Sequence, residues 1–167
     1  MTPRHLAVPT LALSLLTSFA PSASAATGSA SDPRGDAPAY IDVTRVTVRN
    51  ATARVTFRVK VRDLGKGGTL VAYLYDGSSG VEFKAHRRSN GSVAVKVTNT
   101  DLDDTYPVDC SDVRGSWQPA KDKIKLSAPQ DCFQVTDTPS SWFAGVTMRG
   151  RAGDKADKTD GLTVERG

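Results

Sequence analysis

Apolar residues recur at every second position through most of the chain, which is the spacing of a half-buried β-strand. The clearest alternation covers residues 54–62, where four apolar side chains lie between polar ones: Val55, Phe57, Val59 and Val61. Residues 41–48 show the same alternation with a slip of one position, which predicts a β-bulge near Thr44 and Arg45. No segment sustains the 3.6-residue spacing of an amphipathic helix.

Turn-forming residues separate the alternating segments. Asp76–Gly80 predicts a tight turn, and Asn90-Gly91 predicts a β-hairpin with a type I′ turn. Further strands are expected over residues 70–75, 81–85, 93–97, 113–117, 123–126, 142–148 and 162–164. Eight or so short strands predict an all-β fold, an antiparallel β-sandwich of the jelly-roll or immunoglobulin-like kind.

The first 25 residues predict an export signal. Arg4 and His5 precede an apolar run of about 14 residues, shorter than the roughly 20 that a spanning helix needs, and Ala23-Ser24-Ala25 fits a cleavage site. The small, polar segment 26–31 is expected to be a flexible leader. Residues 32–167 are expected to form one sandwich domain of a secreted protein without a stable membrane span.

Cysteine and histidine content limits the chemistry. Cys110 and Cys132 are the two cysteines, and in an exported chain we expect them to form a disulfide that contributes about 3 kcal/mol. His86 is the single histidine after the signal, and neither Ser89 nor Ser92 beside it lies in a G-x-S-x-G motif. The sequence therefore predicts a protein that is not an enzyme, with a hydrolase as the distant alternative.

Three short motifs carry a resemblance to a known group: Asp32–Asp36 with Ile41-Asp42, Ser116–Pro119 with Asp122, and Ala128–Phe133. They resemble small exported actinobacterial proteins of unknown function, over about residues 32–166. The sandwich of that group is similar to family 9 carbohydrate-binding modules and DOMON-type domains. The resemblance implies a sandwich fold and directs attention to sugar, haem or calcium as ligands, although the chain lacks a Met/His pair for haem.

A sugar site stacks an aromatic ring on the sugar face and surrounds it with polar groups. The candidate ligand-binding residues are Trp117, Trp142, Tyr73 and Tyr75. They would bind an extracellular glycan or a cell-wall polymer. Both tryptophans also fit core positions of strands, where large rings are common, so a structural role stays open for them.

Calcium is the one metal that the sequence suggests, and no other cofactor is expected. Aspartates cluster near both ends of the predicted domain: Asp32, Asp36, Asp42, Asp154, Asp157 and Asp160. Calcium binds six to eight oxygen ligands, and the two clusters would converge if the first and last strands paired. The spacing is not that of an EF-hand, and Lys155 and Lys158 lie among the aspartates, so turn capping is the alternative.

The charge balance is mildly basic, with 22 Lys and Arg against 18 Asp and Glu. Two predicted strands carry cationic outward sides: Arg54, Arg58, Lys60 and Arg62 on one, and Lys84, His86 and Arg88 on the other. On one sheet they would suit wall phosphates or acidic glycans, whereas an ordinary solvated face is the alternative.

The leading hypothesis is a non-catalytic binding or envelope-associated module. Its alternative is an exported structural or protein-interaction protein with no small ligand. Nucleic acid is not expected as a partner, since the chain has an export signal and no recognised nucleic-acid-binding motif. The oligomeric state stays open.

Overall fold

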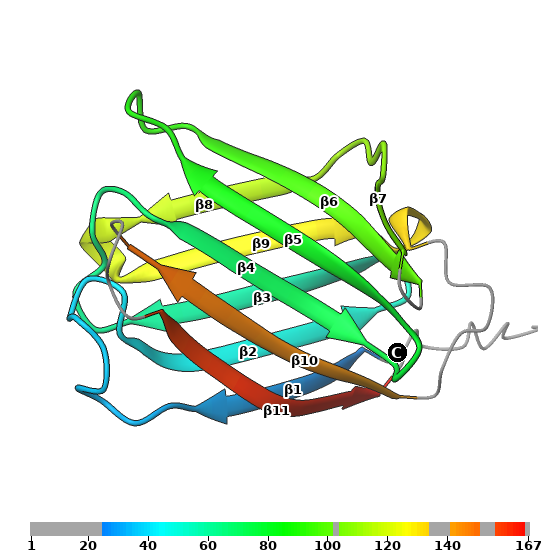
Figure 1. The fold of residues 1–167 in the computed structure, drawn as a ribbon, viewed down its shortest axis with the longest axis horizontal. Helices are drawn as coiled ribbons and strands as arrows, with labels where there is room; N and C mark the ends of the chain where they lie inside the picture. The colour runs from blue at the N-terminus through cyan, green and yellow to red at the C-terminus, as the bar shows by residue number, and fades with distance from the viewer. Residues whose placement is uncertain (1–24, 102–103, 134–140, 151–155, 166–167) are drawn as a thin grey trace, which may run out of the picture.

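The computed structural model of the chain is a β-sandwich of two antiparallel sheets (Figure 1). It describes residues 25–101, 104–133, 141–150 and 156–165. Eleven strands lie in these ranges, which confirms the predicted all-β sandwich and exceeds the eight or so strands expected. The helices described are two short 3₁₀ turns, Pro119–Lys121 and Gln130–Cys132, and neither is long and apolar enough to cross a membrane.

One sheet has five strands in the order β1-β2-β3-β9-β8. These are β1 (Ala26–Ser31), β2 (Val43–Ala51), β3 (Arg54–Val61), β9 (Lys123–Pro129) and β8 (Arg114–Gln118). The other sheet has six strands in the order β11-β10-β4-β5-β6-β7. These are β11 (Asp157–Glu165), β10 (Ser141–Arg149), β4 (Thr69–Tyr75), β5 (Ser79–Arg87), β6 (Val93–Asp101) and β7 (Asp104–Pro107).

The inward side chains of both sheets form one apolar core. Along β3 and β5 the buried positions alternate as predicted, and Phe57 of β3 meets Phe83 of β5 with ring centroids 5.6 Å apart. Phe133 packs edge-on against Phe83 at 5.8 Å. Trp117 is buried, and its indole nitrogen donates a hydrogen bond of 2.8 Å to the Gly65 carbonyl, which satisfies its one polar group.

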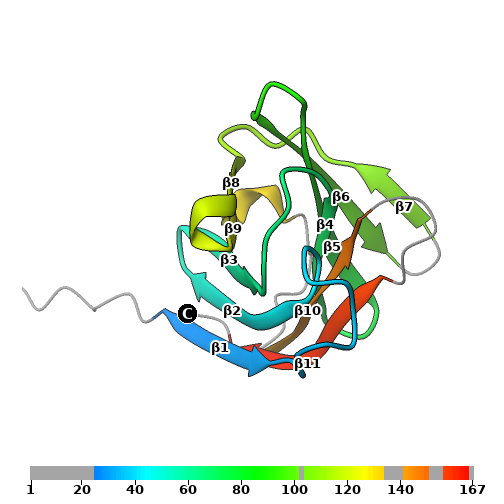
Figure 2. The same ribbon diagram turned by 90° about the vertical axis from the view of Figure 1, so that its left-hand side faces the viewer.

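The two sheets approach each other at both edges of the sandwich, and a glycine lies at each point of approach. At one edge β1 lies beside β11 (Figure 2), and a Cβ on Gly28 would lie 2.8 Å from Val164 Cγ2. At the other edge, where β8 approaches β6, a Cβ on Gly115 would lie 2.7 Å from Val95 Cγ2. A real Cβ does not tolerate such distances, so the close approach of the two sheets depends on these glycines.

Three local predictions meet different outcomes. The bulge at Thr44-Arg45 is confirmed, because the β2–β3 register shifts between Val43 and Arg45. The hairpin at Asn90-Gly91 is also confirmed, but its turn type was wrong. Gly91 alone has a positive φ, of 86°, and its amide bonds to the Arg88 carbonyl, so the loop is a type I turn closed by a left-handed glycine.

The expectation of a flexible leader at residues 26–31 was wrong, because this segment is strand β1. It pairs antiparallel with β2, with Ser29 opposite Thr47. Its inward positions are occupied by Ala26, Gly28 and Ala30. Such small side chains give no apolar alternation in the sequence, yet they are what the close approach of β11 requires.

The predicted disulfide between Cys110 and Cys132 is present, with Cα atoms 5.4 Å apart. Cys110 lies in the connection from β7 to β8, and Cys132 ends the 3₁₀ turn that follows β9. The bond therefore closes a loop that contains the whole β8–β9 hairpin, as the sequence suggested. No free cysteine is present among the described residues.

Candidate functional site

The five-stranded sheet has an unusual charge composition. None of its five strands, all of which lie in the described part of the chain, contains an aspartate or a glutamate. They contain eight cationic residues: Arg45, Arg49, Arg54, Arg58, Lys60, Arg114, Lys123 and Lys125. Strand pairing places all eight on the outward side, where the remaining positions are mostly serine and threonine. We call this surface the cationic face.

Cations lie directly opposite one another across neighbouring strands of the cationic face. Lys60 of β3 is flanked by Arg45 of β2 and Lys123 of β9, which makes a row of three. In the next row Arg58 faces Lys125. Like charges opposite each other destabilise a sheet, because neighbouring strands are only about 4.8 Å apart. One facing pair, Lys84 and Lys96, also occurs on the six-stranded sheet, so what distinguishes the cationic face is the row of three cations and the lack of carboxylates on its strands.

Among the described residues, anionic side chains form ion pairs with the cationic face at one corner. Asp112 forms ion pairs of 2.6 Å with Arg54 and 2.8 Å with Arg114. Hydrogen bonds from the two guanidinium groups lower the pKa of Asp112, and the bond from Arg114 has the larger effect. The other six cations form no ion pair with any described residue. Two of them donate to neutral acceptors: Arg45 to the Ser29 hydroxyl at 3.0 Å and Lys60 to the Lys121 carbonyl at 3.4 Å.

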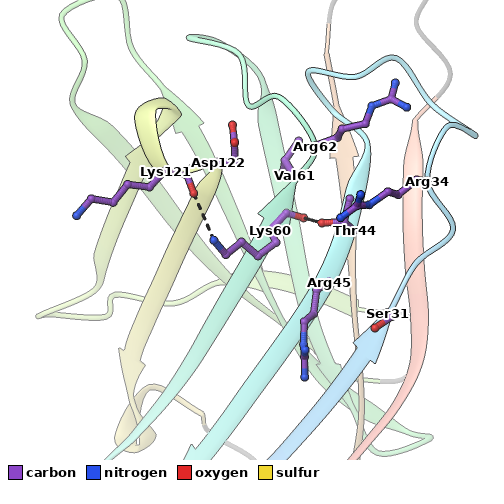
Figure 3. Close-up of a pocket in the computed structure, with 9 residues that line it drawn as sticks. All are labelled: Ser31, Arg34, Thr44, Arg45, Lys60, Val61, Arg62, Lys121 and Asp122. Carbon is purple, nitrogen blue, oxygen red and sulfur yellow. Dashed lines mark hydrogen bonds between the residues drawn. The ribbon is translucent and has the colours of Figure 1, made fainter.

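Two open hollows lie on the cationic face. The first, of about 510 Å³, is lined mainly by cations that extend from β2, β3 and the adjoining loops (Figure 3): Arg34, Arg45, Lys60, Arg62 and Lys121. Its one carboxylate, Asp122, accepts a hydrogen bond of 2.9 Å from the Leu64 amide. The second hollow, of about 420 Å³, combines Arg54, Arg114 and Lys125 with hydroxyl groups. Such hollows suit phosphate, sulfate or carboxylate groups, which arginine binds through two parallel hydrogen bonds.

The prediction of one basic surface from two strands needs correction. Lys84 and His86 lie on β5 of the other sheet, and Arg88 follows that strand, so none of them joins Arg58 and Lys60. Their place is taken by Arg45 and Arg49 of β2 and by Lys123 and Lys125 of β9. The alternation of lysine with buried residues in β9 was visible in the sequence, but its pairing with β3 joins segments more than 60 residues apart.

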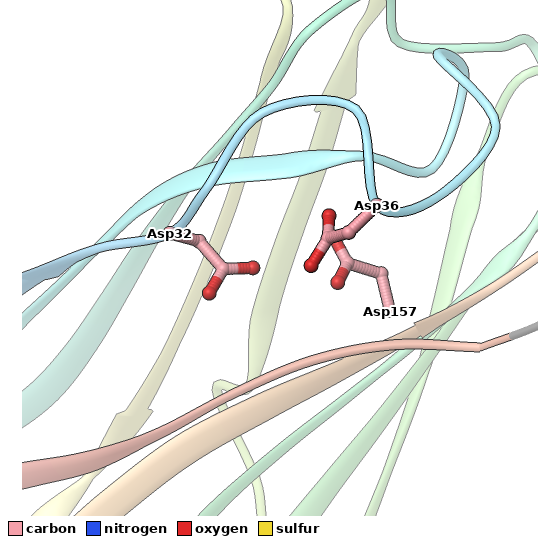
Figure 4. Close-up of side chains that lie close together, drawn as sticks. All are labelled: Asp32, Asp36 and Asp157. Carbon is pink, nitrogen blue, oxygen red and sulfur yellow. The ribbon is translucent and has the colours of Figure 1, made fainter.

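A second charged site is acidic. Asp32 and Asp36, from the loop after β1, lie beside Asp157, the first residue of β11 (Figure 4). One carboxylate oxygen from each lies within 4.8 Å of the other two. We call these three residues the acidic cluster. They come from both ends of the described chain, as the sequence predicted, but β1 and β11 meet across the edge of the sandwich and not as paired strands.

Burial shapes the electrostatics of the acidic cluster. Asp157 is 4% exposed, and its Oδ2 accepts a hydrogen bond from the Val43 amide. Desolvation, with the charges of Asp32 and Asp36, raises the pKa of Asp157 to about 6 despite this hydrogen bond. Desolvation is also the main reason why the pKa of Asp32 is raised. No described cation forms an ion pair with the three carboxylates.

The other predicted calcium ligands are not members of the acidic cluster. Asp42 is fully buried next to the cluster, where its Oδ2 pairs with Arg62 Nε at 3.1 Å and accepts a hydrogen bond from the Gly35 amide. Asp160 is exposed and forms an ion pair of 2.6 Å with Lys158. Asp154 lies outside the described residues.

The candidate aromatic residues divide between core and surface. Trp117 and Trp142 are each 6% exposed, so neither offers a ring face to a ligand. Tyr73 and Tyr75 lie on the outer side of β4, and they line a hollow of about 240 Å³ with Phe143. Phe143 lies opposite Tyr75 on β10 and is 54% exposed. Sequence reasoning missed Phe143, because its place on a surface depends on the strand pairing.

Comparison with protein-family models, curated proteins and solved structures found no match.

Proposed function

We propose that the chain is an exported, non-catalytic binding module whose cationic face binds anionic extracellular polymers, such as acidic glycans or phosphate-bearing wall polymers. The observation that carries the proposal is the segregation of charge. Eight cations and no carboxylates lie on the strands of one sheet, although the net charge of the whole sequence is only +4. The electrostatic potential above the cationic face depends on where the charges lie as well as on their sum, so a small net charge is compatible with a positive potential there.

The rows of the cationic face suit a linear polymer with repeated anionic groups. Lys60 and its two neighbours present cations at intervals of one strand spacing, about 4.8 Å. A chain lying across β2, β3 and β9 would meet several cations at once, and such contacts add by multivalency. Serine and threonine hydroxyls between the rows supply further hydrogen-bond donors. Because the chain is expected to be exported, extracellular polymers are favoured over nucleic acid as its partners.

The test is affinity electrophoresis in gels that contain dextran sulfate, with neutral dextran as the reference polymer. Arg58→Gln with Lys125→Gln removes one facing pair from the cationic face. Lys84→Gln with Lys96→Gln is the matched control, since these lysines also face each other but lie on the six-stranded sheet. We expect the first pair to weaken dextran sulfate binding about 10-fold, because two exposed charge contacts contribute roughly 1.5 kcal/mol.

The control pair should change the affinity less than about threefold, a small fraction of the loss expected from two direct contacts. An equal loss in both double variants would contradict the proposal, because only net charge would then matter. Absence of dextran sulfate binding by the wild-type protein at low salt would also contradict it.

A second candidate function is binding of a neutral sugar at the aromatic hollow. It is favoured by the exposed Tyr75 and Phe143, which lie opposite each other on β4 and β10, and by Gly80 beside Tyr75 and Gly145 beside Tyr73. A Cβ at Gly145 would lie 2.3 Å from the Tyr73 hydroxyl, so that glycine allows the tyrosine to lie flat across β10. Phe143→Ala should abolish retardation by a neutral polysaccharide if this site is used, and it should leave dextran sulfate binding unchanged.

A further inference from the structure

The acidic cluster has more oxygen atoms facing it than its three carboxylates. Thr159 follows Asp157 by two residues on the same inward side of β11 and is 3% exposed. Its hydroxyl faces the Asp32 carboxyl group and lowers the pKa of that group, although Thr159 Oγ1 makes no hydrogen bond of ordinary length and angle. Asp32 Oδ2 and Asp42 Oδ1 are also buried without a partner.

Buried polar atoms without a partner are rare in native proteins, because each costs about 1–3 kcal/mol. Here three such oxygens lie at one place, next to carboxylates whose negative charges are not balanced by a described cation. The Thr159 hydroxyl can donate a single hydrogen bond, which is too little for three carboxylates that lie together without a described cation. This arrangement of oxygens favours a cation as the ligand of the acidic cluster.

We infer that the acidic cluster binds a calcium ion through Asp32, Asp36 and Asp157, with Thr159 as a neutral oxygen ligand. Calcium takes oxygen ligands at 2.3–2.6 Å, so two of its ligands can be up to about 4.8 Å apart. The three carboxylate oxygens satisfy this limit. The ligands come from an irregular loop and a strand end, and calcium accepts such geometry more readily than magnesium, which requires a near-ideal octahedron.

The position of the site predicts what the ion does. Asp32 and Asp36 follow β1 of one sheet, whereas Asp157 and Thr159 belong to β11 of the other. The ion would therefore join the two sheets at the edge where Gly28 allows them to approach. It would also remove the repulsion among the three carboxylates, of which Asp157 is buried. Calcium binding should thus stabilise the fold, independently of any polymer on the cationic face.

The test is thermal and urea unfolding of the whole secreted chain in EDTA, in 10 mM CaCl₂, in 10 mM MgCl₂ and in KCl of equal ionic strength. Extracellular calcium modules have dissociation constants of about 10⁻⁴–10⁻³ M, so 10 mM calcium should raise the folded-to-unfolded ratio about 10- to 100-fold. No calcium-dependent rise would overturn the site. An equal rise in MgCl₂ or KCl would overturn calcium as its ion.

Variants separate this site from a general effect of calcium. Asp157→Asn should remove the response while leaving the protein as stable in EDTA as the wild type, because the amide oxygen can still accept the Val43 hydrogen bond. Asp36→Asn should weaken the calcium response, and it should not impair folding because Asp36 is exposed. Asp160→Asn on the same strand is the matched control and should respond like the wild type. A full response in both cluster variants would overturn the inference.

Discussion

Lys60→Gln should make the protein more stable and a weaker binder at the same time. Lys60 lies between Arg45 and Lys123, so its charge is repelled from both sides. Two unit charges about 6 Å apart in water repel by roughly 0.7 kcal/mol before screening. This is an upper limit for each neighbour, because Arg45 bonds to Ser29 on β1 and Lys60 to the Lys121 carbonyl. For two neighbours, screening leaves at most about 1 kcal/mol in 10 mM salt and about 0.2 kcal/mol in 1 M salt.

Urea unfolding of the wild type and Lys60→Gln at the two salt concentrations measures this difference. We expect the variant to gain up to about 1 kcal/mol in 10 mM NaCl, equivalent to at most roughly 3 °C in Tm, and almost nothing in 1 M NaCl. Its affinity for dextran sulfate should fall about three- to fourfold through loss of one exposed charge contact. A variant that is less stable at low salt, or a gain that persists in 1 M NaCl, would refute the electrostatic reasoning.

Three further predictions concern the fold. Reduction of Cys110–Cys132, which closes a separation of 22 residues, should lower the free energy of unfolding by about 3 kcal/mol; an unchanged Tm after reduction would contradict this. Gly28→Val should destabilise by about 1–3 kcal/mol in urea unfolding, because its side chain would overlap β11, and an unchanged midpoint would mean that β1 does not pack there. Arg62→Gln leaves the buried Asp42 carboxylate without its cation and should cost about 1–3 kcal/mol by the same assay, whereas no loss would show that the Gly35 amide is sufficient.

The sequence was sufficient where local patterns decide the structure. Alternation in β3 and β5 identified the inward side chains, and the phase slip in β2 located its bulge. β1 was missed because its inward residues are small, a feature that only the neighbouring β11 explains. The type I turn before Gly91 was missed for a related reason, since an Asn-Gly pair fits more than one loop length and the pairing of β5 with β6 selects between them.

The candidate sites depend on contacts between distant segments. Convergence of Asp32 and Asp36 with Asp157 was expected only if the first and last strands paired, whereas β1 and β11 bring these residues together without pairing. The cationic face could be predicted only in part, because no local rule pairs β3 with β9. Phe143 likewise could not be placed beside Tyr75 from the sequence, because their proximity depends on the pairing of β10 with β4.

The most direct test of the binding surface is a ¹H–¹⁵N correlation spectrum of the labelled protein, titrated with a short sulfated dextran oligosaccharide at low salt. The account predicts that the largest shifts occur at amides of β2, β3 and β9, centred on Arg58, Lys60 and Lys125, and that they disappear in high salt. Shifts centred on Tyr75 and Phe143, or spread evenly over both sheets, would contradict it.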